Sequence, residues 1–345
     1  MAVVSLDIDT FLEKLAQQPL LLDVRSPAEF AHAHIPGAVS LPLFSDEERK
    51  VVGTAYKQES RQQAIKIGLD YFGPKMRPMV ETVEKLNAGK EGVLVHCWRG
   101  GMRSGGVAWL LDLYGIKVFT LKGGYKAFRQ WVLAQFERDY NLQVIGGYTG
   151  SGKTEILGKL ARHGEAVLDL EALADHRGSA FGHLGRAEQP GQEQFENKLA
   201  LALHALGAKP FWVEDESLRI GSLFLPNNFH DQLRKAACVF IDIPFEERLD
   251  HILKTYGSFP VDQLIVAILR IQKRLGPLET KTAINHLVEK EIRQAFAILL
   301  KYYDKFYTKS LNSRPADAKP LNRLNAVAVD TLRNTQLILQ ACSIP

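Results

Sequence analysis

The eight residues from Gly147 to Thr154 restrict the fold of this chain more than any other feature. They read G-Y-T-G-S-G-K-T and fit the pattern G-x4-G-K-[ST]. An apolar run at 142–146 precedes them and a run with helical apolar spacing follows at 156–160, which is the strand–loop–helix setting that the pattern requires. In such a loop, backbone N–H groups surround phosphate oxygens, the lysine reaches a terminal phosphate and the threonine can hold Mg²⁺. The predicted phosphate-binding residues are Gly147, Gly150, Ser151, Gly152, Lys153 and Thr154.

The segments that follow this loop predict a parallel α/β layer. Short apolar runs at 166–169, 211–214 and 238–242 alternate with helical stretches, and this alternation is typical of a parallel sheet. After about residue 246 we expect no further strand. The segments predicted there are helices at 247–256, 262–275 and 282–308, followed by a loop at 310–325.

Charged residues follow two of the predicted strands. Glu214 and Asp215 end the run at 211–214, where either carboxylate can hold a metal ion or its water shell, and an exposed acidic loop is the alternative interpretation. Arg248 follows the run at 241–247, which resembles a stretch common in P-loop kinases. That resemblance makes Arg248 a candidate phosphate contact.

The first part of the chain predicts a second parallel sheet. Strands are expected at 20–24, 92–96 and 117–121, with a helix at 104–114 between the last two. A helix at about 127–140 forms the exit from this domain. The two halves share no motif, so we predict two different α/β domains. These are residues 1–137, and residues 138–345 with a helical, basic part from about 247.

The run from His96 to Ser104, H-C-W-R-G-G-M-R-S, predicts a reactive cysteine. Cys97 ends a predicted strand, and a glycine pair and an apolar helix follow it. Backbone N–H groups and a helix N-terminus directed at the sulfur lower the pKa of a thiol. We therefore expect Cys97 to be a nucleophile, Gly100 and Gly101 to form an anion cradle, and Arg99 and Arg103 to be catalytic donors for an oxyanion.

Two chemistries use such a loop, and upstream residues favour one of them. His-Cys-x5-Arg is the loop of cysteine phosphatases, whereas a cysteine at a strand end with a short anion-binding loop is the loop of rhodaneses. The runs at 22–30 and 34–38, L-D-V-R-S-P-A-E-F and H-I-P-G-A, closely resemble the paired signature segments of the rhodanese family. Within them Asp23 and Arg25 are expected to be scaffold residues that tie a strand end to nearby loops. The loop from Cys97 to Arg103 is one residue longer than in many single-domain sulfurtransferases, so a phosphate-sized group can fit, and the phosphatase interpretation stays open.

Further segments extend the resemblance over nearly the whole chain. The runs at 169–182 and 194–197, together with the cysteine loop and the phosphate loop, are similar to those of the tRNA 2-selenouridine synthase family. This resemblance implies a transferase that replaces the sulfur of 2-thiouridine at the tRNA wobble position with selenium. It implies selenophosphate as the selenium donor, geranyl diphosphate as the source of an S-geranyl intermediate, and Cys97 as the selenium-carrying nucleophile. It implies no tightly bound prosthetic group, and it suggests the selenophosphate-producing enzyme as a partner.

The charge distribution adds a candidate surface for RNA. Residues 248–345 hold 15 basic and 8 acidic residues, whereas residues 142–247 hold 10 and 15. A basic segment favours an anionic macromolecule, and a solvated helix surface is the alternative. We expect Lys301 and Lys305 to contact the backbone of a tRNA whose anticodon loop presents the wobble base.

Several classes of protein are disfavoured by the sequence. No uncharged apolar run is long enough to span a membrane, and the N-terminal residues lack the basic region and apolar core of a secretory signal. The three cysteines, Cys97, Cys238 and Cys342, form no metal-binding pair, so we expect no structural metal. Their small number and wide spacing favour a reducing compartment, so we expect a cytoplasmic protein. Two alternative functions stay open. One is a cysteine phosphatase with a regulatory nucleotide site, and the other is a non-enzymatic, nucleotide-dependent RNA-binding module.

Overall fold

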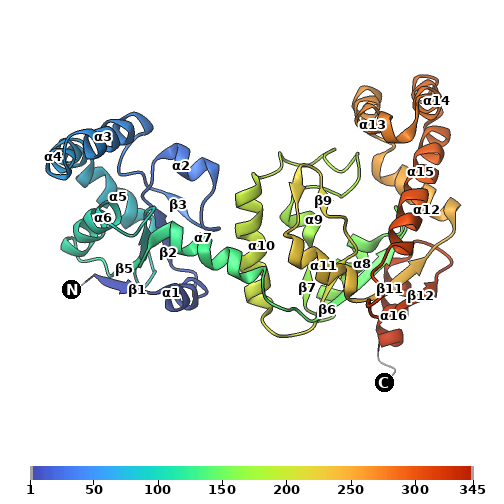
Figure 1. Cartoon of the computed structure of the whole chain (residues 1–345), viewed down its shortest axis with the longest axis horizontal. Helices are drawn as coiled ribbons and strands as arrows, with labels where there is room; N and C mark the ends of the chain where they lie inside the picture. The colour runs from blue at the N-terminus through green and yellow to red at the C-terminus, as the bar shows by residue number, and fades with distance from the viewer. Residues whose placement is uncertain (1–2, 343–345) are drawn as a thin grey trace. The chain divides into compact units, whose positions relative to one another are not determined.

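The computed structural model describes residues 3–342, so the outermost residues of both predicted domains, 1–2 and 343–345, lie outside it. The chain divides into two compact units (Figure 1). The first comprises Met1–Gln135 and Glu196–Lys198, and the second comprises Phe136–Phe195 and Leu199–Pro345. Among the described residues, no helix is long and apolar enough to cross a membrane.

The first unit is built on a parallel five-stranded sheet in the order β1-β5-β4-β2-β3. The predicted strands are confirmed as β2 (Leu20–Asp23), β4 (Val93–His96) and β5 (Val118–Leu121), and every residue of each is buried. The short strands β1 (Val4–Leu6) and β3 (Val39–Ser40) complete the two edges and were not expected. The helices are α1 (Ile8–Leu15), α2 (Pro27–His32), α3 (Asp46–Gln58), α4 (Arg61–Phe72), α5 (Met76–Leu86), α6 (Met102–Leu113) and α7 (Gly124–Gln135).

The position of β4 determines where the cysteine lies. β4 is flanked by β5 and β2, and Asp23 at the end of β2 is in register with His96 at the end of β4. Because parallel strands end at one edge, the residues that follow β2 and β4 gather at the same edge. Helix α6 returns from this edge and buries Val107 and Leu111 in the core.

The second unit contains a parallel five-stranded sheet in the order β12-β11-β6-β8-β7. The predicted strands are confirmed as β6 (Leu142–Gly147), β7 (Val167–Leu168), β8 (Phe211–Glu214) and β11 (Ala237–Asp242). β6 is the central strand, between β11 and β8, so the loop that follows it lies at the carboxyl end of the middle of the sheet. Further elements are α8 (Lys153–Arg162), α9 (Leu170–Leu173), α10 (Gln192–Leu206), α11 (Asn227–Lys235), α16 (Thr331–Cys342) and a hairpin of β9 (Arg219–Ile220) and β10 (Leu223–Phe224).

The structure corrects the expectation that no strand follows residue 246. β12 (Leu321–Asn325) lies in the segment predicted as a loop and pairs in parallel with β11 over five residues. Its sequence, L-N-R-L-N, is largely exposed, because β12 is an edge strand. A polar edge strand carries no continuous apolar signal, so only its pairing with β11 identifies it.

Helices of the second unit continue beyond this sheet (Figure 1). The predicted helices at 247–256 and 262–275 are confirmed as α12 (Phe245–Tyr256) and α13 (Val261–Leu275). The run expected at 282–308 is two helices, α14 (Pro277–Val288) and α15 (Ile292–Asn312), and Lys290 between them has a left-handed φ of 63°. The helix expected at 127–140 also ends earlier, at Gln135. α12–α15 share an apolar core with Phe181 and Leu184, and this core includes Leu264, Leu287 and Phe296.

Candidate functional site

Cys97 lies directly after β4, at the start of the loop that leads into α6. The side chain is buried, with 2% of its surface exposed. The N-terminal backbone of α7 holds the loop in place. The Tyr125 N–H donates to the Cys97 carbonyl over 2.8 Å, and the Lys126 N–H donates to the Trp98 carbonyl over 2.9 Å. These two bonds turn the loop carbonyls toward α7 and fix the backbone on either side of the sulfur.

Two glycines allow the close approach of the loop to the end of β5 and to the start of α7. Gly100 has φ +62°, and a Cβ there would lie 2.5 Å from the Leu121 carbonyl oxygen. Gly124 has φ +59°, and a Cβ there would lie 2.3 Å from the Cys97 carbonyl oxygen. Gly101 caps the N-terminus of α6 and has open space around it. The backbone therefore requires glycine at Gly100, whereas the predicted anion-cradle role of both loop glycines stays a prediction.

The surroundings of Cys97 favour its thiolate. Burial opposes ionisation, but hydrogen bonds from the Ser104 hydroxyl and backbone N–H, together with the charge of Arg103, outweigh it. The pKa of Cys97 therefore lies below its ordinary value. The Ser104 Oγ lies 3.2 Å from the Cys97 Sγ, and Ser104 belongs to the first turn of α6, where helix N–H groups favour an anion.

The two predicted loop arginines differ in their surroundings. Arg99 is exposed. Arg103 forms a two-point ion pair with Glu29, with its Nη1 donating to Oε2 over 2.6 Å and its Nη2 donating to Oε1 over 3.3 Å. Burial opposes ionisation of Glu29, but the Arg103 guanidinium outweighs it and lowers the pKa of that carboxyl. Glu29, a residue that sequence reasoning did not single out, therefore occupies two of the five N–H donors of the Arg103 guanidinium.

A buried polar network supports the same edge of the sheet and confirms Asp23 and Arg25 as scaffold residues. The Arg25 guanidinium donates to both carboxylate oxygens of Asp23, and its Nη2 also donates to the Ala33 carbonyl over 2.7 Å. His96 lies beside them, and burial, with a contribution from Arg25, lowers its pKa to about 4. At neutral pH His96 therefore carries no charge to assist the sulfur, and this task is left to Ser104 and Arg103.

In the second unit the phosphate loop has the backbone that its sequence predicts. Gly150 and Gly152 adopt φ +81° and +74°, and a Cβ at Gly147 would lie 2.4 Å from the Ser151 Oγ. Lys153 begins α8, and its Nζ donates to the Gly147 carbonyl over 2.9 Å. The ammonium group thus lies across the loop, where a phosphate ligand would meet it.

Three glutamates gather at Thr154. The Thr154 hydroxyl lies 3.1 Å from the Glu171 Oε2 and 3.5 Å from the Glu214 Oε2. Glu171, Glu214 and Glu216 each offer one carboxylate oxygen within 4.8 Å of the others. Burial, followed by the charges of its two neighbours, raises the pKa of Glu214 well above the ordinary value. Burial and Glu171 likewise raise the pKa of Glu216 to about 8.

Strand geometry explains which acidic residues meet the loop. Side chains alternate along an extended backbone, so Glu214 and Glu216 point to one side and Asp215 to the other. Asp215 accepts a hydrogen bond of 2.6 Å from the Tyr307 hydroxyl and does not belong to the cluster. Of the two acids predicted as metal ligands, the structure brings Glu214 to Thr154. The period of two could have indicated Glu216, whereas no local signal indicated Glu171.

This cluster fits Mg²⁺. Hydroxyl and carboxylate oxygens are the ligands that the ion prefers. Among the residues that the structure describes, the Glu214 Oε1 is buried with no hydrogen-bond partner, which an ion or its water would supply. Thr154, Glu171, Glu214 and Glu216 are the residues that would hold it. The ion would neutralise the charge of these carboxylates.

Arg248 is hydrogen-bonded to the backbone of the phosphate loop. It is almost fully buried, and its Nη1 donates to the Thr149 carbonyl over 3.1 Å. Its guanidinium also forms two bonds of 2.8 Å with Asp304 of α15, while its Nε donates to the Ile243 carbonyl. All three guanidinium nitrogens are thus bonded to protein oxygens, so Arg248 positions the loop. Its predicted direct contact with phosphate stays a prediction.

Helix α15 separates its cations from most of its aromatic rings. Lys301 and Lys305 are exposed, as the predicted RNA surface requires. Tyr303 and Tyr307 face inward: the Tyr303 hydroxyl accepts from the Ala180 N–H, and the Tyr307 hydroxyl accepts from the Gly147 N–H over 3.3 Å. Arg293, in the first turn, forms ion pairs with Glu246 and Asp250 of α12. These aromatic residues therefore pack the helix, and the lysines remain its RNA-facing candidates.

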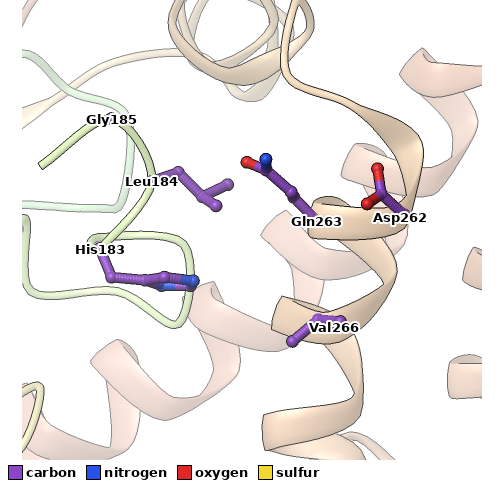
Figure 2. A pocket seen from close by; sticks show the side chains of 6 residues that line it. All are labelled: His183, Leu184, Gly185, Asp262, Gln263 and Val266. Atoms are coloured by element: carbon purple, nitrogen blue, oxygen red, sulfur yellow. The ribbon is translucent and has the colours of Figure 1, made fainter.

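A shallow hollow is also found in the second unit (Figure 2). It has a volume of about 230 Å³ and lies between the segment 183–185 and the first turns of α13. None of the predicted site residues lines it. The lining residues are His183, Leu184, Gly185, Asp262, Gln263 and Val266.

The folds and sites define a chain that joins a rhodanese-like domain to a P-loop domain. It matches the model of the rhodanese-like domain over residues 7–130 and that of the tRNA 2-selenouridine synthase AAA domain over residues 140–265. A protein of Nitrosomonas europaea named tRNA 2-selenouridine synthase is 38% identical over 293 residues, covering 82% of this chain and 74% of the relative. A protein of the same name from Pseudomonas fluorescens is 33% identical over 342 residues, covering 88% and 91%. The chain belongs to the tRNA 2-selenouridine synthase family.

Proposed function

We propose that this chain is a tRNA 2-selenouridine synthase that exchanges the sulfur of 2-thiouridine at the wobble position for selenium. The observation that carries the proposal is its similarity, along most of both chains, to relatives named for this activity. We further propose selenophosphate as the selenium donor and geranyl diphosphate as the source of an S-geranyl intermediate, with the reaction taking place in the cytoplasm. Geranylation makes the sulfur a better leaving group from C2 of the uracil.

The cysteine loop suits the step that involves selenium. In this proposal Cys97 is the selenium-carrying nucleophile, because the Ser104 hydroxyl and the N-terminus of α6 stabilise its thiolate. Selenophosphate has the size and charge of a phosphate, for which Arg99 and the loop N–H groups are the proposed partners. Arg103 already donates two of its N–H groups to Glu29, which leaves fewer donors for such an anion, and the same holds for the phosphatase alternative, which depends on the same arginine.

The phosphate loop suits the step that transfers the geranyl group. A diphosphate bound there would contact the loop N–H groups and Lys153, whose Nζ would exchange its bond to the Gly147 carbonyl for a phosphate oxygen. Charge develops on the diphosphate as it leaves, and Lys153 stabilises that charge. Thr154 and the three glutamates would hold Mg²⁺ beside it.

The wobble base must leave the stack of neighbouring bases before it can enter an active site. An anticodon loop makes unstacking inexpensive, because its bases are not paired. We propose that the exposed Lys301 and Lys305 of α15 contact the tRNA backbone, which is a sequence-independent contribution to affinity.

Separate assays of the two steps test this function. The purified chain is incubated with tRNA that contains 2-thiouridine, first with geranyl diphosphate and Mg²⁺ and then with selenophosphate, and wobble nucleosides are identified by mass spectrometry. Cys97→Ala should form the S-geranyl nucleoside but no 2-selenouridine, whereas Lys153→Ala should form neither. Cys238→Ala is the matched cysteine control and should form both. Normal 2-selenouridine from Cys97→Ala would refute the role of the sulfur, and ATP binding that geranyl diphosphate does not displace would refute that of the loop.

A further inference from the structure

A large aromatic side chain is exposed next to the nucleophile. Trp98 follows Cys97 directly in the loop, and 38% of its surface is accessible. Arg99 and Met102, which follow Trp98 in the chain, are exposed as well, and 52% of the surface of Met102 is accessible. The loop therefore exposes an indole, a guanidinium and a thioether within five residues of Cys97.

The backbone and the indole ring of Trp98 are both held in place by residues of α7. The Trp98 backbone carbonyl accepts a hydrogen bond from the Lys126 N–H. The indole ring packs against the Tyr125 ring, with the ring centroids 5.7 Å apart and the planes inclined by 38°. Tyr125 is fully buried, and the Arg25 guanidinium covers its ring at 3.9 Å. Trp98 is therefore the outermost member of a stack that rests on the buried Asp23–Arg25 ion pair. An aromatic ring fixed in this way loses little conformational entropy when a ligand covers it.

The chemistry of this surface points to a planar, partly apolar ligand. A small oxyanion can use only the single N–H donor of an indole, whereas the apolar face of the Trp98 ring suits a flat ligand. A base that has left its stack loses contact on both faces, and proteins replace that contact with aromatic rings and guanidinium planes. The adjacent Arg99 can pair with the phosphate of the same nucleotide.

We propose that Trp98 is the stacking platform for the nucleobase that is modified at Cys97, with Arg99 positioned for its phosphate. The proposal rests on the proposed action on tRNA and adds the residue that places the base at the sulfur. Stacking of one base on an aromatic side chain corresponds to about 5-fold to 150-fold in affinity. We expect the loss of affinity to be about tenfold, because one face of the Trp98 ring is already covered and only the other can stack on a base.

The test compares two RNAs that differ only in the base. One is an anticodon stem–loop with 2-thiouridine at the wobble position, and the other has an abasic site there. Their dissociation constants are measured by fluorescence anisotropy on the whole 345-residue chain at one salt concentration. Trp98→Leu should weaken binding of the thiolated RNA about tenfold and leave the abasic RNA unchanged, and Trp98→Phe should recover most of the loss. Trp109→Leu is the matched control, because Trp109 lies in α6 with 53% of its surface exposed and should affect neither RNA.

The outcomes separate this proposal from the proposed function. If the wild-type chain modifies tRNA but Trp98→Leu binds both RNAs as the wild type does, or loses affinity equally for both, the platform is refuted and the function stands. If the wild-type chain neither modifies tRNA nor prefers the thiolated RNA to the abasic one, both are refuted. Thermal unfolding of Trp98→Leu and Trp109→Leu, measured in parallel, distinguishes a folding defect from a lost contact.

Discussion

Replacing Ser104 with alanine removes one of the groups that keep the Cys97 sulfur ionised. The Ser104 Oγ lies 3.2 Å from that sulfur and also 3.2 Å from the Gly101 carbonyl oxygen. A hydroxyl has one proton, so it can donate to only one of them at a time. When Cys97 is a thiol, the sulfur can donate to the hydroxyl, which in turn donates to Gly101. When Cys97 is a thiolate, the hydroxyl proton must turn to the sulfur.

The size of the effect follows from this exchange. A hydrogen bond to a charged group contributes about 1.5–3 kcal/mol. Because the hydroxyl gives up its bond to Gly101 when it turns to the sulfur, the lower end of this range, about 1.5 kcal/mol, applies to Ser104. One pKa unit corresponds to about 1.4 kcal/mol, so the pKa of Cys97 should rise by about one unit in Ser104→Ala. The Ser104 N–H and the charge of Arg103 remain in the variant, so the shift reports the contribution of the hydroxyl.

The rate of alkylation by iodoacetamide measures this pKa, since only the thiolate reacts. Rates are recorded at a series of pH values, and the peptide that contains Cys97 is quantified by mass spectrometry. The midpoint should move upward by about one unit, and the rate at high pH should be at least that of the wild type, because a more basic thiolate is more nucleophilic. Cys238 is the internal control, because burial raises its pKa to about 12 and it should stay unlabelled in both proteins. An unchanged midpoint in a folded variant would show that Ser104 does not stabilise the thiolate.

Three further predictions concern the second unit. In EDTA, the free energy of unfolding should fall as the pH rises between about 4.5 and about 8, because the folded protein keeps Glu216 protonated up to about pH 8. Urea denaturation should show this slope reduced by Glu216→Gln or by Mg²⁺, and a slope that survives both would contradict the carboxylate cluster. Asp304→Asn leaves the buried Arg248 without its charged partner and should cost about 3 kcal/mol in the same assay. Lys301→Glu combined with Lys305→Glu should weaken tRNA binding and flatten its dependence on salt, with geranyl diphosphate binding unchanged, and an unaltered salt slope would exclude this face of α15.

The sequence by itself determined the elements whose signals are local. The phosphate loop follows from eight consecutive residues, since Gly150 and Gly152 must adopt left-handed φ values and an apolar strand precedes them. The cysteine loop is local in the same sense, with a buried strand, a glycine at Gly100 and a helix that starts at Met102. Such patterns determine backbone conformation within a few residues, so the sequence is sufficient to predict them.

The tertiary structure decided which distant side chains meet these loops. Glu171 reaches Thr154 from another segment, and Glu29 reaches Arg103 from a helix 74 residues earlier in the chain. Likewise, the polar strand β12 exists because it pairs with β11. No periodicity encodes such contacts, since they depend on the order of strands in a sheet and on which helix covers its edge. The sequence therefore specified the cysteine loop and the phosphate loop, whereas packing between distant segments decided which charges surround them.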